Sequence, residues 1–268
     1  MDGFPLCLNT STIQPTPLLE KIHIAGRLGY DAIEPWIGEI DAFAERGSLG
    51  ELRRIITDAG LHVASVIAVE GWLDSDPSRR TAALDECRRR MDSAAALGCP
   101  FLVATPPDQP VETDRAVDAY ARLLDLGRHH SIRPALEFLG FAPSIKTLDS
   151  ALAIARATGN PDACVVADVF HLLRGGGSLD DLLQLKPGEL AIFHINDLPA
   201  SPPFLDQSDS DRVLPGDGVV DLPRVISHLR TVGYNGPLSL ELFNKELWKQ
   251  PPEDVARRGL ERLQKLLD

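Results

Sequence analysis

Basic residues are scarce relative to acidic ones in this chain. Its 268 residues include 27 Lys and Arg against 39 Asp and Glu, which gives a formal net charge of −12. Affinity for nucleic acid depends largely on basic side chains that neutralise phosphates. The one basic run, RRR at 88–90, lies among acidic residues, which is typical of a solvated helix face. We therefore expect no nucleic-acid partner.

Long apolar segments and clustered cysteines are also missing. No uninterrupted apolar run approaches the roughly 20 residues of a membrane-spanning helix, and the first residues, MDGFPLCLNTST, do not resemble a signal peptide. The cysteines are scattered, with no CxxC spacing; they are Cys7, Cys87, Cys99 and Cys164. Buried, reduced thiols suit a cytoplasmic protein. We expect a cytoplasmic protein that does not bind a membrane.

One kind of junction recurs along the chain, in LGYDAIE (28–34), AGLHVAS (59–65), LGCPFLV (97–103) and VGYNGPLSL (232–240). Each has an apolar helix end, a glycine suited to the left-handed conformation that closes a helix, and then a short apolar strand. Amphipathic stretches such as PLLEKIHIAGRLG (17–29) lie between the junctions. The pattern predicts alternating strands and helices.

The count of these units predicts the fold. Eight strands are expected, each followed by a helix, near 5–9, 30–34, 61–68, 100–105, 133–138, 163–168, 190–195 and 237–241. Eight strand–helix units in about 250 residues are typical of a (β/α)₈ TIM barrel. A doubly wound open sheet is the alternative, but no GxGxxG turn follows the first strand. No linker divides the chain, so we predict a single domain over 1–268.

Residues able to bind a metal end four consecutive predicted strands. They are Glu137 in PALEFLG, Asp168 in VVADVFH, His194 in AIFHIND and Glu241 in LSLELFN. Functional residues of such barrels gather at the C-terminal ends of the strands. A carboxylate in an apolar run like that of Asp168 needs a metal ion, a salt bridge or exposure to offset its burial. Carboxylates with one imidazole suit Mn²⁺, Mg²⁺, Co²⁺ or Zn²⁺, and we expect an ion to compensate Asp168.

The chain resembles the sugar isomerase/epimerase group of the xylose isomerase-like TIM barrels. The words that carry the resemblance span the predicted barrel, namely GYDAIE, IRPALEFLG, VVADVFH, FHINDLP, DRVLPGDGVVDL and LSLELFNKELWK. The resemblance implies one divalent ion, with Mn²⁺ preferred, held by Glu137, Asp168, His194 and Glu241. It also implies that two residues contact the substrate, His171 and Arg212.

The expected chemistry is proton transfer next to a carbonyl. A bound cation polarises the carbonyl and stabilises the enediolate that forms when the neighbouring C–H proton leaves. Two carboxylates on opposite faces of the substrate can take and return that proton, and we predict Glu137 and Glu241 for these roles. The sequence thus predicts a metal-dependent isomerase or epimerase of a small sugar or keto-polyol. A neutral substrate is favoured because no Lys/Arg cluster is evident.

Other candidate substrate contacts come from irregular segments. The stretch 198–220 is rich in Pro, Asp, Ser and Gly, and long irregular segments are usually functional, so a lid over the metal is expected. Within this stretch, the positively charged Arg212 is predicted to bind a substrate oxygen from a loop at the surface. Its replacement should then cost only the roughly 0.5 kcal/mol typical of surface sites. The alternative is a surface arginine paired with Asp209 or Asp211.

Four further residues are predicted near the substrate. His171 follows the strand that ends at Asp168 and could donate a hydrogen bond to a substrate oxygen. Alternatively, it could lie behind the residues that contact substrate, or at the surface. Trp36 and Trp72 follow the second and third strands and are predicted to wall the pocket. Asn9 closes the first strand and is predicted to face the pocket.

Three other functions are compatible with such a barrel. A 3-dehydroshikimate dehydratase-like lyase begins with the same proton abstraction and is the main alternative. An endonuclease IV-like nuclease needs additional His ligands, which are absent from the ends of the third and fourth strands, SVIAVEG and VATPPD. A non-catalytic sugar-binding barrel would not need to keep the costly carboxylates. A homo-oligomer remains open, because no interface signature is visible.

Overall fold

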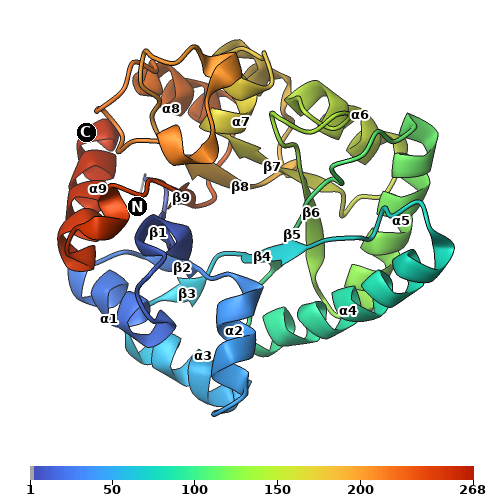
Figure 1. Cartoon of the computed structure of the whole chain (residues 1–268), viewed down its shortest axis with the longest axis horizontal. Coiled ribbons are helices and arrows are strands. Elements are labelled where there is room, and N and C mark those ends of the chain that lie inside the picture. The colour runs from blue at the N-terminus through green and yellow to red at the C-terminus, as the bar shows by residue number, and fades with distance from the viewer. Residues whose placement is uncertain (1–2) are drawn as a thin grey trace.

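A ring of parallel strands enclosed by helices forms the framework (Figure 1). It is a computed structural model that describes residues 3–268. The strands are β1 Leu6–Asn9, β2 Ala32–Glu34, β3 His62–Val63, β4 Val66–Val69, β5 Phe101–Ala104, β6 Arg133–Glu137, β7 Cys164–Asp168, β8 Leu190–Ile195 and β9 Leu238–Leu240. The α-helices are α1 Leu18–Leu28, α2 Ile37–Ala44, α3 Leu49–Asp58, α4 Pro77–Ala96, α5 Thr113–His129, α6 Leu148–Ala157, α7 Val169–Arg174, α8 Leu222–Thr231 and α9 Pro252–Leu267.

The strands follow the order β3-β2-β1-β9-β8-β7-β6-β5-β4, and each ladder is parallel. This confirms the predicted barrel with one difference, because the predicted strand 61–68 is divided into β3 and β4. The first half pairs with β2 and the second with β5, and the ladder is interrupted at Ala64 and Ser65. The ring nearly closes there, where the N–H of Ile67 donates to the carbonyl oxygen of Pro35 at 3.1 Å.

The glycine junctions take the conformation that the sequence predicts. Gly29, Gly60, Gly98 and Gly233 have φ angles of 91°, 79°, 74° and 73°. These values lie in the left-handed region, where a side chain with a Cβ is disfavoured. Each glycine therefore ends one helix and turns the chain back toward the next strand.

The strand residues alternate between two apolar layers. Large side chains such as Leu8 and Ile33 face the helices, whereas small ones such as Cys7 and Ala32 fill the barrel interior. Successive strand residues point to opposite sides, so the residue two positions beyond an interior one also points inward. This rule places a polar layer above the interior core; its members are Asn9, Glu34, Glu137, Asp168 and His194, each two residues after an interior residue of β1, β2, β6, β7 or β8.

The first and last α-helices pack together on the outside of the barrel. Helix α9, red in Figure 1, lies beside α1, in blue. Next to this contact, the hydroxyl of Tyr30, two residues after α1, donates to the carbonyl oxygen of Ala256 in α9 at 2.8 Å. Within residues 3–268, none of the helices has both the length and the apolar character needed to cross a bilayer.

Candidate metal centre

A cavity of about 500 Å³ opens at the C-terminal ends of the strands. It is lined by Trp36, Ile67, Ala68, Glu70, Gly71, Thr105, Pro106, Pro107, Asp108, Glu137, Leu139, Phe141, His171, Asp209, Arg212, Glu241 and Phe243. Because parallel strands of a barrel present their C-terminal ends at one rim, residues distant in sequence converge here. The cavity unites Glu137, Glu241, His171, Arg212 and Trp36 of the predicted site residues.

Three of the four predicted ligands lie within bonding range of one point. Glu137, His194 and Glu241 each offer one donor atom, and these atoms lie within 4.8 Å of one another. Nδ1 of His194 lies 3.4 Å from Oε1 of Glu137 and 3.2 Å from Oε2 of Glu241. This nitrogen is fully buried and has no hydrogen-bond partner, which is costly unless another group binds it. The donor set therefore fits a divalent cation.

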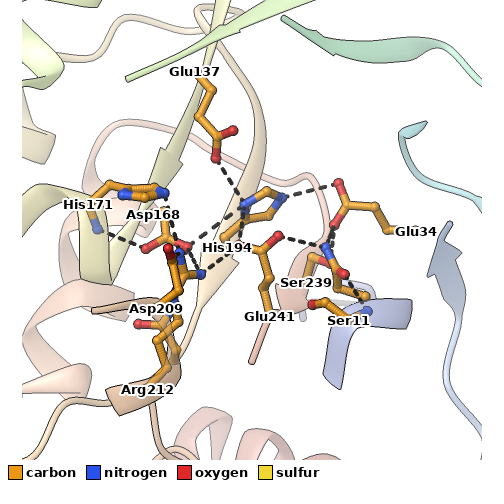
Figure 2. A network of polar contacts seen from close by, with 12 residues as sticks. Ser11, Glu34, Glu137, Asp168, His171, His194, Asp209, Arg212, Ser239 and Glu241 are labelled. Carbon is orange, nitrogen blue, oxygen red and sulfur yellow. Dashed lines mark hydrogen bonds and ion pairs between the residues drawn. The ribbon is translucent and has the colours of Figure 1, made fainter. Parts of the chain in front are cut away.

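The other nitrogen of His194 fixes the orientation of the ring. Nε2 lies 3.1 Å from Oε1 of Glu34 (Figure 2). A carboxylate oxygen accepts the hydrogen bond in such a contact, so Nε2 carries a proton and Nδ1 faces the ligand cluster, where loss of its own proton would free a lone pair for an ion. Metal-binding histidines commonly donate their second N–H in this way. Glu34 is the last residue of the predicted strand 30–34; the contact was not predicted, although the period of two along β2 could have indicated it.

Asp168 is compensated by a salt bridge. Its Oδ2 accepts from Nη1 of Arg212 at 2.9 Å and from Nδ2 of Asn196 at 3.1 Å, and its Oδ1 accepts from the N–H of His171 at 3.0 Å. Its Oδ2 lies 3.8 Å from Nδ1 of His194, at the edge of the cluster. Arg212 thus supplies one of the three ways of offsetting the burial of Asp168 that the sequence left open, although burial still raises the pKa of Asp168 to about 6.

The expectation that Arg212 lies at the surface is wrong, since its side chain is only 1% exposed. Nη1 also donates to Oε2 of Glu241 at 2.6 Å, and Nη2 donates to Oδ1 of Asp209 at 2.6 Å. The guanidinium carbon lies 4.5 Å from the ring centre of Phe170 and 5.1 Å from that of Phe243. The predicted pairing with Asp209 is present, but within a buried network.

The segment that carries Arg212 is organised by one buried carboxylate. Oδ1 of Asp197 accepts from the N–H groups of Leu198 and Val220, and Oδ2 accepts from those of Gly216 and Gly218. A Cβ at Gly218 would lie 2.2 Å from Oδ1 of Asp197, so only glycine allows this approach. The predicted irregular stretch is therefore fixed to the barrel at both of its ends.

His171 lines the cavity next to Arg212. The backbone N–H of Gly140 donates to its Nδ1 at 3.2 Å. Burial, followed by the nearby Arg212 charge, holds the pKa of His171 well below its ordinary value, so the imidazole is neutral. Its Nε2 lies 3.3 Å from Nη2 of Arg212, which can only donate, so both ring nitrogens of His171 face N–H groups of the protein. The imidazole lines the cavity beside Arg212, where the predicted contact with a substrate oxygen would form.

Of the three remaining residues predicted to contact substrate, one lines the cavity and two do not. Trp36 lines the cavity, as expected. Trp72 is 1% exposed and donates from Nε1 to the carbonyl oxygen of Thr105 at 2.9 Å, so it belongs to the core and not to the cavity wall. Asn9 is fully buried; its Nδ2 donates to Glu34 and Glu241 at 2.9 and 3.0 Å, so it holds carboxylates instead of facing the cavity.

The two predicted exchanging carboxylates have different environments. Burial raises the pKa of Glu137 to about 7, although His194 opposes the shift. Burial also acts to raise the pKa of Glu241, but His194 and Arg212 outweigh it and hold that pKa well below its usual range. Paired groups with separated pKa values are typical of acid–base sites. Before an ion binds, Glu137 can exchange a proton near neutral pH while Glu241 stays ionised.

The barrel and this centre match a known class of protein. The family model described as "Xylose isomerase-like TIM barrel" matches residues 22–266, and the chain belongs to this family. Within the family, the sequence motifs quoted above for the resemblance predict that the chain is most similar to inosose isomerase, and the comparisons confirm a similarity to inosose isomerases. The chain is 27% identical over 262 residues to the inosose isomerase of Halalkalibacterium halodurans, covering 94% of this chain and 92% of the relative.

Two further comparisons extend the picture. The 3-dehydroshikimate dehydratase of Pseudomonas putida is 25% identical over 253 residues, covering 92% of this chain but 39% of the relative. Among solved structures, the IOLI protein with a bound zinc atom superposes with a TM-score of 0.92 at 24% identity, covering 98% of each chain. The structural likeness confirms the fold.

Proposed function

We propose that the protein is a divalent-metal-dependent isomerase or epimerase of a neutral sugar or keto-polyol, of the inosose isomerase kind. The observation that carries the proposal is the buried, unpartnered Nδ1 of His194, which faces Glu137 and Glu241 at the cavity floor. The relatives support it, because they are named inosose isomerases. A structural neighbour at 20% identity and a TM-score of 0.80 is a D-psicose 3-epimerase.

Glu137, Asp168, His194 and Glu241 would hold the ion, with Mn²⁺ preferred and Mg²⁺, Co²⁺ or Zn²⁺ as alternatives. The IOLI structure, which has the same fold, contains a zinc atom, and this supports the proposal of a metal. A divalent ion there would polarise the substrate carbonyl and stabilise the negative charge that develops when the adjacent proton leaves.

The chain's own residues perform the proton transfer. Glu137 and Glu241 lie on opposite flanks of the ligand cluster, on β6 and directly after β9, and one takes the C–H proton that the other returns. His171 would contact a substrate oxygen from the cavity wall. Arg212 holds Glu241 and Asp168 in place through Nη1. The enediolate form of the substrate thus stays within a site of fixed dipoles and charges.

The charges of the cavity favour a neutral substrate. Carboxylates are the main charged groups of its lining, contributed by Glu70, Asp108, Glu137, Asp209 and Glu241. Within the described residues, Arg212 is the only Lys or Arg that lines the cavity, and three carboxylates already occupy it. Among the residues that the structure describes, the cavity lining has no Lys or Arg without a carboxylate partner that could bind a phosphate or carboxylate group of a substrate, which disfavours a phosphorylated sugar and dehydroshikimate alike.

Other expectations accompany this function. We propose a single domain that acts on a small molecule in the cytoplasm, without a nucleic-acid or membrane partner. The described cysteines, all buried and free, support a reducing compartment. A homo-oligomer is compatible with the family and is not required by the cavity.

The test is turnover by the metal-loaded protein in D₂O of a panel of keto-inositols, ketohexoses and dehydroshikimate, followed by NMR. We expect rearrangement of a neutral keto-polyol with deuterium incorporated from solvent. Loss of water from dehydroshikimate, with no reaction of the neutral compounds, would replace the proposal with the dehydratase function. Removal of the ion with a chelator should abolish turnover, and re-addition should restore it.

A further inference from the structure

Glu34 lies below the cavity floor and receives only hydrogen-bond donors. It is fully buried and does not line the cavity. Its Oε1 accepts from the hydroxyl of Ser65 and faces Nε2 of His194 at 3.1 Å. Its Oε2 accepts from Nδ2 of Asn9 at 2.9 Å and from the hydroxyl of Ser239 at 2.6 Å. The donors come from β1, β8, β9 and the residue between β3 and β4; Figure 2 labels two of them, His194 and Ser239, beside Glu34.

Asn9 links this carboxylate to a second ligand. Its Oδ1 accepts from the backbone N–H of Ser11 at 2.9 Å. Since a backbone N–H can only donate, the oxygen of the amide must face Ser11, and the NH₂ group must face the carboxylates. Nδ2 then donates to Oε2 of Glu34 and, at 3.0 Å, to Oε1 of Glu241. Glu34 therefore orients His194 directly and Glu241 through Asn9.

We propose that Glu34 is a positioning residue that sets the ion affinity of the site by orienting His194 and Glu241 together. It contacts neither the cavity nor the position of the ion, so it acts only through these two ligands. The carboxylate form is required, because an amide NH₂ in either orientation would face a nitrogen that donates, either Nε2 of His194 or Nδ2 of Asn9. The inference rests on the proposed function in one respect, that the site binds a divalent ion.

The experiment measures the affinities of wild type and Glu34→Gln for Mn²⁺ and for Zn²⁺, each by competition with a chelator. Loss of a hydrogen-bond partner behind a metal ligand typically costs 10–100-fold in affinity, and we expect a decrease of about that size. With Co²⁺ as the probe, the visible absorption spectrum of the variant should shift, because the ring of His194 loses its fixed orientation. Thermal unfolding of the ion-free proteins is recorded in parallel.

Glu39→Gln is the matched control. Glu39 is a partly buried carboxylate that pairs with Lys21 and accepts from Thr10, but contacts none of the ion ligands. Its replacement should lower the unfolding temperature of the ion-free protein and leave ion affinity and the Co²⁺ spectrum unchanged. An equal loss of affinity in both variants would show general loosening and overturn the inference.

Ser239→Ala keeps the inference testable if Glu34→Gln fails to fold. It removes one donor to Glu34 without touching an ion ligand, and we expect a smaller but measurable loss of affinity. Wild-type affinity in a folded Glu34→Gln variant overturns the role of Glu34. If Glu34→Gln misfolds, wild-type affinity in Ser239→Ala overturns it instead. Both outcomes leave the proposed function intact. A wild-type protein that binds no ion overturns both.

Discussion

Arg212 and Glu241 form a buried ion pair, with Nη1 of the guanidinium 2.6 Å from Oε2 of the carboxylate. The side chains are 1% and 5% exposed, so water screens neither charge. The pair joins the segment after β8 to the residue that follows β9, directly beside the ligand cluster. Arg212 was expected only to contact substrate, but it also neutralises buried carboxylates inside the barrel.

Arg212→Ala should destabilise the protein as well as inactivate it. The change leaves Asp168 and Glu241 buried without their cation, and breaking a buried pair typically costs about 3–5 kcal/mol. Chemical denaturation of the ion-free protein measures the loss. Arg262→Ala is the control, because Arg262 pairs with Asp217 in a contact about 40% exposed on each side and should cost no more than about 1 kcal/mol. Equal effects of the two changes would contradict the buried-pair assignment.

One divalent ion should copurify with each chain or be taken up on addition. The basis is one cluster of convergent donors around His194. Elemental analysis should find about one equivalent per chain, and His194→Ala should reduce retention after dialysis against chelator by at least tenfold. Three ions per chain, or unchanged content in His194→Ala, would be incompatible with this centre.

The stabilisation given by the ion should grow as pH rises from 5 to 8. Burial raises the pKa of Glu137 to about 7 and of Asp168 to about 6. Burial lowers the pKa of His194, but Glu241 and Glu34 outweigh it and raise it well above the usual value. Groups with raised pKa values stabilise the fold below their unfolded values and lose that contribution as pH rises through the folded ones.

The ion-free protein should therefore weaken across this range, while the ligands become deprotonated and bind the ion better. The measurement is the difference in unfolding temperature between ion-loaded and chelator-treated protein at pH 5, 6, 7 and 8. A difference that is constant, or largest at pH 5, would show that these groups do not hold the ion.

Glu137→Gln and Glu241→Gln should each lower turnover by roughly two to four orders of magnitude, because each removes one partner of the proton exchange. The wild-type product formed in D₂O should carry deuterium at the reprotonated carbon. A substrate deuterated at the transferring carbon controls for internal return. Full retention of that label at the neighbouring carbon, with Glu241→Gln still active, would establish a hydride shift.

The parts of the structure that the sequence predicted are those governed by local rules. Gly29 and Gly98 mark helix ends because of their φ angles, and the alternation of inward and outward residues fixes which side chains meet inside the barrel. Glu137 and His194 follow from strand ends alone. Hydrophobicity could not separate Trp72 from Trp36, because both follow strands, and only the packing sends one into the core.

The burial of Arg212 could not be inferred from its neighbours in sequence. The stretch 198–220 is polar, and its placement depends on contacts with Asp168 and Glu241, distant in sequence. Those contacts in turn require Asp197 to fix the path of the backbone. Long-range pairing of this kind leaves no periodic pattern.

The attachment of that stretch to Asp197 has an evolutionary consequence. Since Leu198 and Val220 bind the same carboxylate oxygen, the distance between the ends does not depend on what lies between them. Insertions or replacements near its tip can be tolerated without a change in the barrel, whose strands keep the donor cluster. New substrate preferences could therefore arise from changes in the residues around Arg212, provided that Arg212 itself is kept and continues to pair with Asp168 and Glu241.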